Sequence, residues 1–259
     1  MAAETPKVKL YWLEKSRAQN ILWLLEELKI DYEIETFRRG RDMLAPKELK
    51  NIHPLGKSPL VSITAPGPSE PIVLAESGFI TQYLSEHFGH DTTLVPRRWK
   101  EGQEGKAGGE TEEWLRWQYL LHFVEGSLMS LLTVTLILNI IKGPRVPFFI
   151  RPLTSMVVGQ VFSSFVLPNI KSVFGFLEKQ LETSGGDFLC GKNLTSADIL
   201  ISFGLISATT EAYGFGPEGG FGTLFPKLYA YIDRLEAQPG YKRAVEKIRQ
   251  IDSSLGVKL

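Results

Sequence analysis

The chain has 259 residues, a length that corresponds to one large domain or two moderate ones. Apolar residues make up 43% of the sequence and charged residues 22%, as in ordinary globular proteins with a substantial core. Lysine plus arginine and aspartate plus glutamate each total 29, so no global excess of charge attracts nucleic acid. We therefore expect no nucleic-acid partner.

The content of cysteine and histidine argues against metal and disulfide chemistry. The only cysteine is Cys190, which excludes an intrachain disulfide, a paired-cysteine redox motif and a cysteine-based zinc site. The histidines lack the spacing of metal ligands, and they stand at His53, His87, His90 and His122. We expect no bound metal.

The distribution of apolar residues predicts a cytoplasmic protein. The first residues lack the apolar core of a signal peptide. The most apolar run, Leu128–Ile141, is shorter than the roughly 20 residues that span a bilayer. We interpret this run as a buried core helix.

Residues 1–92 mix the periodicities of strands and helices. The segments typical of strands are Lys7–Leu13, Asp31–Phe37, Pro59–Thr64 and Pro71–Leu74. Those typical of helices are Ser16–Lys29, Ala45–Ile52 and Ser77–Phe88. The order βαβ-α-ββα predicts an α/β domain with a four-stranded mixed sheet.

The rest of the chain shows only helical patterns. A charged, glycine-rich stretch at 93–109 is typical of an exposed linker. From 110 to 259 the candidate helices are Glu110–Lys142, Arg151–Glu182, Ser196–Ala212, Phe225–Ala237 and Gly240–Gln250. We predict an all-helical second domain over 110–259.

Two polar stretches of the first domain point to a peptide-binding site. Pro59 lies at the mouth of a short apolar strand, where a proline indicates a special turn with a cis Ser58–Pro59 bond. Such a turn leaves the Ser58 backbone to pair with an extended ligand. Glu76 and Ser77 open the next helix, and a helix N-terminus attracts a carboxylate. Together the two stretches predict a site for a small zwitterionic peptide.

Ser16, at the start of the first helix, has two interpretations. With Gln19 it fits a capping box, a purely structural role. Alternatively, its hydroxyl donates a hydrogen bond to a ligand sulfur, and donors near a helix N-terminus lower the pKa of a thiol from about 8.5. Tyr11 competes for the same role from the end of the first strand, although an aromatic residue there also suits sheet packing.

The other polar residues also keep a structural alternative. Ser77 and Glu76 are suitable as a helix cap and a favourable charge at the helix start. Lys57 and His53 are either solvated turn residues or contacts for an anion. Thr195–Asp198 resembles a capping box and is assigned no chemistry.

Several segments together resemble the cytosolic glutathione transferases, most closely the fungal class of the yeast microsome-associated type. They lie at 11–18 (YWLEKSRA), 23–28 (WLLEEL), 53–60 (HPLGKSPL), 75–80 (AESGFI), 124–128 (VEGSL) and 194–200 (LTSADIL). The resemblance covers nearly the whole chain, and the order and spacing of the segments carry it.

The resemblance implies a thioredoxin-like N-terminal domain, an all-α C-terminal domain with the hydrophobic substrate pocket, and a homodimer. It implies glutathione as co-substrate, with Ser58 beside cis Pro59 on the cysteinyl backbone and Glu76 and Ser77 on the γ-glutamyl group. Lys57 and His53 would approach the glycyl carboxylate. Ser16 matches the thiol-activating serine of Ser-type members, and Tyr11 lies near the donor of Tyr-type members.

The implied activity is addition of the glutathione thiolate to hydrophobic electrophiles, with reduction of organic hydroperoxides as a second activity. The alternative is a glutathione-dependent protein that sequesters apolar metabolites. Residues 97–109 and 146–165 look longer than the family minimum. The apolar stretches Leu128–Ile141 and Phe148–Val166 also suit peripheral contact with the endoplasmic reticulum membrane.

Overall fold

The computed structural model describes residues 5–40, 42–143, 146–210 and 220–251. The chain forms two compact units: one contains residues up to Val95 together with the C-terminal stretch from Glu236, and the other contains Pro96–Leu235. The sequence-based boundaries, 1–92 and 110–259, assign this C-terminal stretch to the helical part. Packing instead groups it with the first unit.

The first unit is built on a four-stranded mixed sheet in the order β2-β1-β3-β4. The strands are β1 (Lys7–Leu13), β2 (Tyr32–Phe37), β3 (Leu60–Thr64) and β4 (Ile72–Ala75). β1 is parallel to β2, and β3 is antiparallel to both β1 and β4. The predicted order of strands and helices in this part of the chain is confirmed, as is the mixed sheet.

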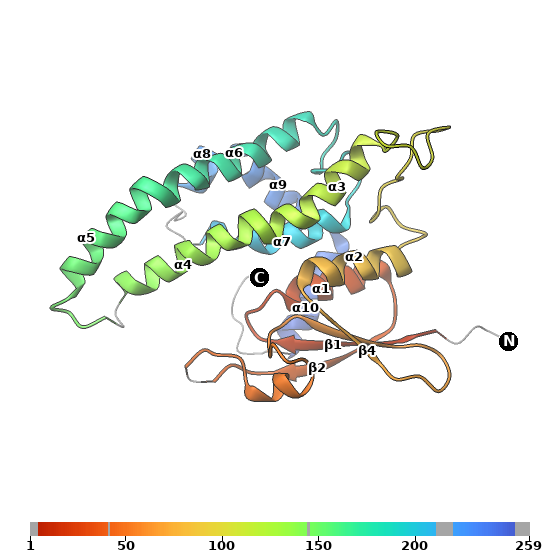
Figure 1. Cartoon of the computed structure of the whole chain (residues 1–259), viewed down its shortest axis with the longest axis horizontal. Helices are drawn as coiled ribbons and strands as arrows, with labels where there is room; N and C mark the ends of the chain where they lie inside the picture. Colours follow the sequence, from red (N-terminus) through yellow and green to blue (C-terminus); the bar gives the residue numbers. More distant parts are fainter. Residues whose placement is uncertain (1–4, 41, 144–145, 211–219, 252–259) are drawn as a thin grey trace. The chain divides into compact units, whose positions relative to one another are not determined.

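Alternation along β1 divides the sheet into two faces. Val8, Leu10 and Trp12 are buried on one face, and helices α1 (Ala18–Leu28) and α2 (Ser77–Phe88) pack on the sheet (Figure 1). A second apolar cluster joins Leu13 and Leu60 to Leu49 of the short 3₁₀ helix η1 (Lys47–Asn51). The sequence predicted an α-helix over Ala45–Ile52, and the segment is instead one short, tighter turn.

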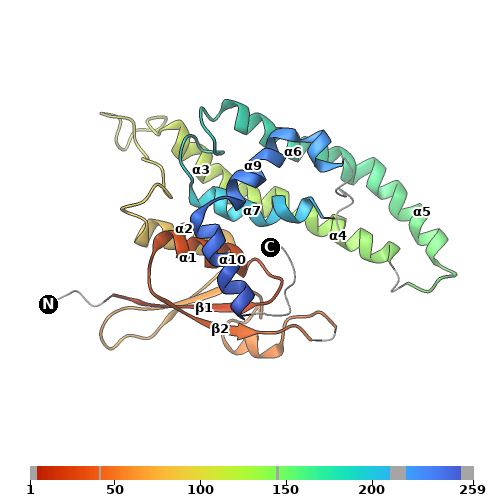
Figure 2. The ribbon, with the colours of Figure 1, turned by 180° about the vertical axis from the view of Figure 1, so that it is seen from behind.

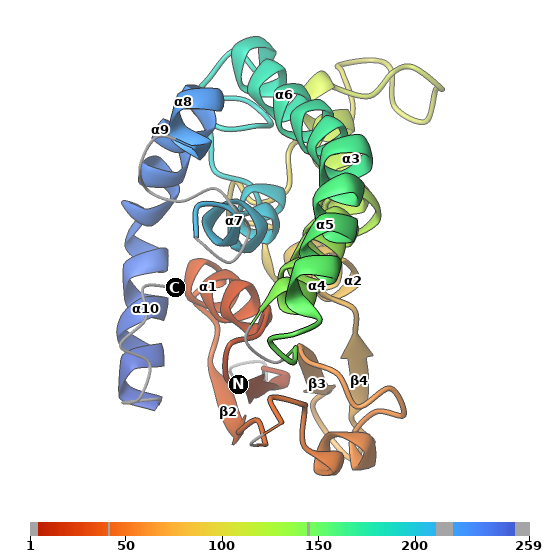
Figure 3. The same cartoon turned by 90° about the vertical axis from the view of Figure 1, so that its left-hand side faces the viewer.

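The last helix, α10 (Pro239–Ile251), packs against α1 (Figure 2). Figure 3 shows α1 between α10 and α2. Trp23 and Tyr241 meet edge to face with their ring centroids 5.1 Å apart. The buried Glu26 carboxylate accepts hydrogen bonds from Lys247 at 2.6 Å and Arg243 at 3.1 Å. An aromatic contact and the ion pairs of the buried Glu26 carboxylate with two half-exposed cations therefore hold α10 on the first unit.

The second unit is helical, as predicted. Its two longest rods form a hairpin: α3 (Glu112–Phe123), η2 (Val124–Met129) and α4 (Ser130–Lys142) in one, and α5 (Arg151–Val161), η3 (Phe162–Val166) and α6 (Leu167–Thr183) in the other. Both η2 and η3 are π-helical turns. The remaining helices are α7 (Ser196–Ala208), α8 (Phe221–Leu224) and α9 (Pro226–Glu236).

Buried polar groups fix the core of this unit. The predicted capping box is present at the start of α7, where Asp198 accepts from the Thr195 amide at 2.8 Å. Asp198 is fully buried and also accepts from the Tyr231 hydroxyl at 2.5 Å. Burial raises the pKa of this carboxyl, and the hydrogen bonds from Thr195 and Tyr231 oppose the rise.

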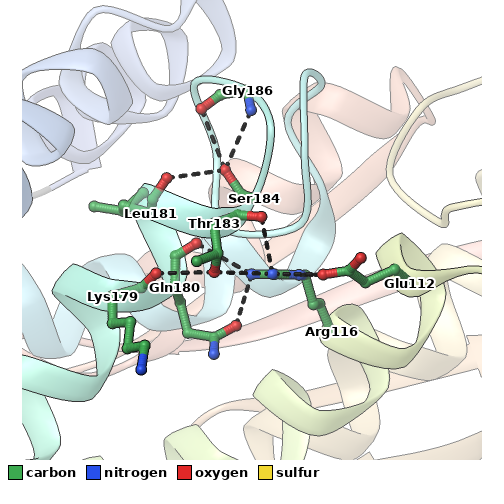
Figure 4. A network of polar contacts seen from close by, with 8 residues as sticks. All are labelled: Glu112, Arg116, Lys179, Gln180, Leu181, Thr183, Ser184 and Gly186. Atoms are coloured by element: carbon green, nitrogen blue, oxygen red, sulfur yellow. Dashed lines mark hydrogen bonds and ion pairs between the residues drawn. The ribbon is translucent and has the colours of Figure 1, made fainter.

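Arg116 of α3 connects the two rods of the hairpin near the C-terminal end of α6 (Figure 4). Its guanidinium donates to the Gln180 carbonyl at 3.1 Å and to the Thr183 carbonyl at 3.0 Å. The Glu112 carboxylate accepts from the same group at 2.6 Å. Because the last carbonyls of a helix lack intrahelical partners, Arg116 supplies both donors and a favourable positive charge.

The segment that precedes α3 is an ordered run of turns. The amides of Gln103, Lys106 and Gly109 each donate to the carbonyl three residues earlier, and the Lys100 amide donates to the Gly109 carbonyl at 2.9 Å. Glycines with positive φ at 102, 105 and 108 make these repeated turns possible. Residues 100–109 of the stretch predicted as a linker thus form a closed loop with its own hydrogen bonds.

The apolar run Leu128–Ile141 is only partly core, which corrects the prediction of a buried helix. Leu128, Leu131 and Leu132 are buried, whereas Ile137 is 51% exposed. The stretches Glu112–Lys142 and Arg151–Thr183 are long and apolar enough to cross a membrane by length and composition alone. Only 28% of the most apolar part of Glu112–Lys142 is buried, and only 17% of that of Arg151–Thr183. The sequence shows that the run is apolar, but not which residues of it are covered. In the fold, neighbouring segments bury only the N-terminal end of the run.

Candidate functional site

The register of the sheet brings the two polar stretches of the first unit together. Leu60 pairs with Ala75 across the antiparallel β3–β4 ladder. The residues just before Leu60 are Ser58 and Pro59, and those just after Ala75 are Glu76 and Ser77. Because antiparallel neighbours run in opposite directions, the two pairs emerge at the same end of the sheet.

The turn that leads into β3 has the geometry predicted from its proline. The Ser58–Pro59 peptide bond is cis. Gly56, two residues earlier, has φ +58° and donates its amide to the His53 carbonyl at 2.9 Å. A Cβ at this position would meet the Lys50 side chain at 2.6 Å. Both the positive φ and this close approach therefore favour glycine in the turn.

A shallow depression of about 50 Å³ lies at this end of the sheet. It is bordered by Arg17, His53, Leu55, Lys57, Ser58, Pro59, Leu60, Ala75, Glu76 and Ser77. The volume is too small to enclose a ligand of the usual size, so a ligand would lie across it and remain open to solvent on one side. Cationic side chains and one carboxylate share the rim, a pattern complementary to a zwitterion.

All the residues predicted to bind the peptide border this depression: His53, Lys57, Ser58, Pro59, Glu76 and Ser77. Glu76 is exposed, whereas Ser77 is fully buried at the first position of α2. Sequence reasoning missed Arg17. Its position beside Ser16, at the N-terminus of the first helix, was the available signal.

Ser16 lies below this surface and does not border the depression. The residue is 6% exposed; its Oγ donates to the Leu13 carbonyl at 2.7 Å and accepts from the Ala18 amide at 3.2 Å. Helix α1 begins at Ala18 with Arg17 as its N-cap, so the capping box predicted at Ser16 is not formed. The Ser58 Oγ is 3.2 Å from the Ser16 Oγ.

Tyr11, the competing candidate, belongs to the face of the sheet that packs against η1. Its ring lies 6.5 Å from that of Phe37, and its hydroxyl is 3.3 Å from the Ser62 Oγ. It packs against the cluster of Leu13, Leu49 and Leu60. Like Ser16, it does not border the depression.

The single thiol belongs to the other unit and is not among the residues that border the depression. Cys190 belongs to the second unit and is buried, and burial raises the pKa of its thiol well above its ordinary value. A neutral, inaccessible thiol is a poor nucleophile. Among the described residues, no group of three or more His, Cys, Asp and Glu side chains is arranged to hold a metal ion.

The fold and this site define a thioredoxin-like domain followed by a helical domain. The family model described as "Glutathione S-transferase, N-terminal domain" matches residues 6–86, and "Glutathione S-transferase, C-terminal domain" matches 159–247. Glutathione S-transferase 1 of Saccharomyces cerevisiae is 33% identical over 96% of this chain and 98% of its own length. The chain belongs to the glutathione S-transferase family.

Solved structures agree with this assignment of the fold. A glutathione transferase from Phanerochaete chrysosporium, crystallised with oxidized glutathione, has a TM-score of 0.67 over 97% of this chain and 99% of that chain, at 18% identity. A homologue from Lodderomyces elongisporus with two glutathione molecules per subunit also has a TM-score of 0.67, over 93% of this chain and 98% of that one, at 18% identity. At this level of identity the likeness concerns the fold alone.

Proposed function

We propose that this protein is an enzyme that activates the thiolate of glutathione and adds it to hydrophobic electrophiles. The observation that carries the proposal is the meeting of Ser58–Pro59 with Glu76–Ser77 beside the cations Arg17 and Lys57 at one depression. Glutathione is an extended zwitterionic tripeptide with two carboxylates and one ammonium group. The rim presents charges that complement both.

Each part of glutathione has its own partners in this proposal. The Ser58 backbone, beside cis Pro59, pairs with the cysteinyl residue as an added strand would. Glu76 binds the γ-glutamyl ammonium group, and the start of α2 at Ser77 receives the neighbouring carboxylate. Lys57 and His53 attract the glycyl carboxylate at the far end of the tripeptide.

Activation of the thiol requires stabilisation of its anion. A thiol with a pKa of about 8.5 is mostly protonated at neutral pH, and donors with a helix N-terminus enrich the nucleophilic thiolate. Ser16, before α1, is the residue that we propose supports this stabilisation, with Tyr11 as the alternative. The contact between Ser16 and Ser58 supports the serine, since the Tyr11 hydroxyl instead pairs with Ser62.

The chemistry needs no covalent intermediate with the protein. In conjugation, the sulfur forms a bond to carbon, and a leaving group such as chloride departs with the bonding electrons. In peroxide reduction, the thiolate attacks one oxygen of the hydroperoxide, the O–O bond breaks and the alcohol departs, which leaves a sulfenic acid on glutathione. A second glutathione thiol attacks this sulfur, water leaves, and the disulfide forms. The protein contributes position and charge stabilisation.

Calorimetry with glutathione, followed by turnover of 1-chloro-2,4-dinitrobenzene and of cumene hydroperoxide, tests this function. We expect glutathione binding, conjugation and a lower peroxidase rate. Ser16→Ala is expected to reduce the conjugation rate, with Tyr11→Phe as the matched test of the alternative. A protein that does not bind glutathione would refute the proposal.

Sequestration of apolar metabolites is the second candidate. A groove of about 650 Å³ on the helical unit is lined by Trp114, Leu115, Tyr119 and Phe176, together with five polar or charged side chains. Its size suits a small hydrophobic molecule. Binding of an apolar dye without turnover of either substrate would favour sequestration. We also propose that the protein is a homodimer, which sedimentation velocity tests directly.

We further propose a cytoplasmic protein with peripheral membrane contact through the α4–α5 end of the hairpin. Phe148 is 77% and Phe149 70% exposed, and Leu153 and Met156 are also exposed. From Gly126 to Leu177 the sequence has no Asp or Glu, and its charges are Lys142, Arg145, Arg151 and Lys171. Exposed apolar side chains combined with positive charge suit an anionic membrane surface.

Co-sedimentation with phosphatidylserine vesicles tests this contact. The double variant Phe148→Ser/Phe149→Ser is expected to lose vesicle binding. Leu224→Ser, a change at an exposed leucine of α8, serves as the control and should leave binding unchanged. A wild-type protein that stays wholly in the supernatant would contradict the idea.

A further inference from the structure

Two serine hydroxyls from distant parts of the first unit meet beside the start of α1. Ser16 follows β1, and Ser58 precedes β3, yet their Oγ atoms are 3.2 Å apart. A serine hydroxyl has one proton to donate and two lone pairs that accept. The roles of the two residues therefore depend on where each single proton is engaged.

The proton of Ser16 is engaged inside the protein. Its Oγ donates to the Leu13 carbonyl at 2.7 Å, a short hydrogen bond between buried groups. The same oxygen accepts from the Ala18 amide at 3.2 Å. Turning this proton outward would break a buried hydrogen bond, and Ser16 does not border the depression where the ligand is proposed to lie.

The proton of Ser58 is held far less firmly. Its partners are the Ser16 Oγ at 3.2 Å and the Tyr11 carbonyl at 3.5 Å, the latter at the outer limit of a hydrogen bond. Ser58 is half-buried and borders the depression. Its hydroxyl can therefore turn toward a ligand without breaking a strong contact.

We infer that Ser58 is the hydroxyl that donates to the sulfur of bound glutathione, and that Ser16 is a positioning residue behind it. This inference rests on the proposed function, in which the Ser58 backbone pairs with the cysteinyl residue and so brings the sulfur within reach of the Ser58 side chain. On ionisation the S–H bond breaks, its proton leaves to solvent, and the Ser58 O–H turns from Ser16 to the thiolate. No bond forms between sulfur and the protein.

The pKa of the bound glutathione thiol tests this assignment. It is measured from the ultraviolet absorbance of the thiolate as a function of pH in the binary complex, together with calorimetric affinity at fixed pH. Ser58→Ala should raise this pKa by roughly one unit, because a donor to the charged form is lost. Ser16→Ala should raise it less.

Two further variants separate the hydroxyl from folding and packing. The side chains introduced by Ser58→Thr and Ser58→Val have nearly the same shape. Threonine carries a hydroxyl group where valine carries a methyl group. The threonine variant should keep the low thiol pKa and the valine variant should lose it. A merely structural role would affect both alike.

The other outcomes overturn the inference. A low thiol pKa in both Ser58→Ala and Ser58→Val, with its loss in Ser16→Ala, would make Ser16 the direct donor. A low pKa in all these variants would assign the role elsewhere, with Tyr11→Phe as the next test. If the wild-type protein does not bind glutathione, both the proposed function and this inference are refuted. The preceding results would overturn the inference alone.

Discussion

Glu76 combines a proposed binding role with an unfavourable backbone conformation. It is the single residue between β4 and α2, and its φ of +70° with ψ 117° lies outside even the small left-handed region open to ordinary residues. Such conformations cost about 1–3 kcal/mol for a residue with a Cβ. Glycine avoids this cost but loses roughly 0.5–1 kcal/mol through the greater freedom of its unfolded chain.

Comparison of Glu76→Gly with Glu76→Ala isolates the conformational cost, since both variants lose the same side chain. The difference between the two estimates predicts that the glycine variant is more stable than the alanine variant by up to about 2.5 kcal/mol. In thermal unfolding this corresponds to roughly 2–4 °C per kcal/mol for a chain of this size. Differential scanning calorimetry measures it.

Glutathione affinity should fall in both variants, including the glycine variant that escapes the backbone strain. A hydrogen bond to a charged group is worth about 1.5–3 kcal/mol, so both variants should bind glutathione roughly 10- to 150-fold more weakly. Glu76→Gln keeps the conformation and length but removes the charge, and it should lose affinity with little change in stability. A glycine variant no more stable than the alanine variant would refute the strain argument.

Further predictions concern contacts that lie within one unit or the other. Arg116→Lys should destabilise the helical unit by about 1–3 kcal/mol, because lysine cannot reproduce the planar set of donors to the α6 carbonyls. Chemical unfolding followed by tryptophan fluorescence measures this loss of stability. An unchanged unfolding midpoint would contradict the prediction. Phe174→Ala, at a fully buried ring that packs against Phe221 at 5.2 Å, should cost about 3–5 kcal/mol in the same assay, and a loss below 1 kcal/mol would show that the site collapses. Burial raises the pKa of Glu26, but the hydrogen bonds from Lys247 and Tyr32 outweigh it, so the net pKa is lowered. The stabilisation is thus complete above the unfolded pKa of about 4.3 and is lost as the pH falls through the lowered value. Urea midpoints at pH 7 and pH 4 should therefore fall further in wild type than in Glu26→Gln, and equal falls would count against the ion pair.

Local patterns in the sequence were sufficient for most of the secondary structure. The alternation of Lys7–Leu13 matches β1 residue for residue, and Ser77–Phe88 matches α2. The proline at the mouth of β3 suggested a special turn with a cis bond, and the Ser58–Pro59 bond is cis. The Thr195–Asp198 spacing likewise predicted its capping box, because both partners lie within one helical turn.

Contacts between distant residues were beyond the reach of such patterns. Ser16 and Ser58 are 42 positions apart, and only the packing of β1 against β3 brings their hydroxyls together. Arg17 reaches the rim of the depression for the same reason. Periodicity records which residues are apolar along one element, and it contains no information on which partner covers them.

The sequence by itself determined the elements, their order and the polar turn chemistry, because these depend on neighbours within a few residues. The tertiary structure alone decided that α10 joins the first unit through Glu26, and that much of α4 remains exposed. Those outcomes depend on which surfaces bury one another. The free energy of burying apolar surface depends on pairs of segments that lie far apart in the chain, so the sequence of one segment alone does not reveal it.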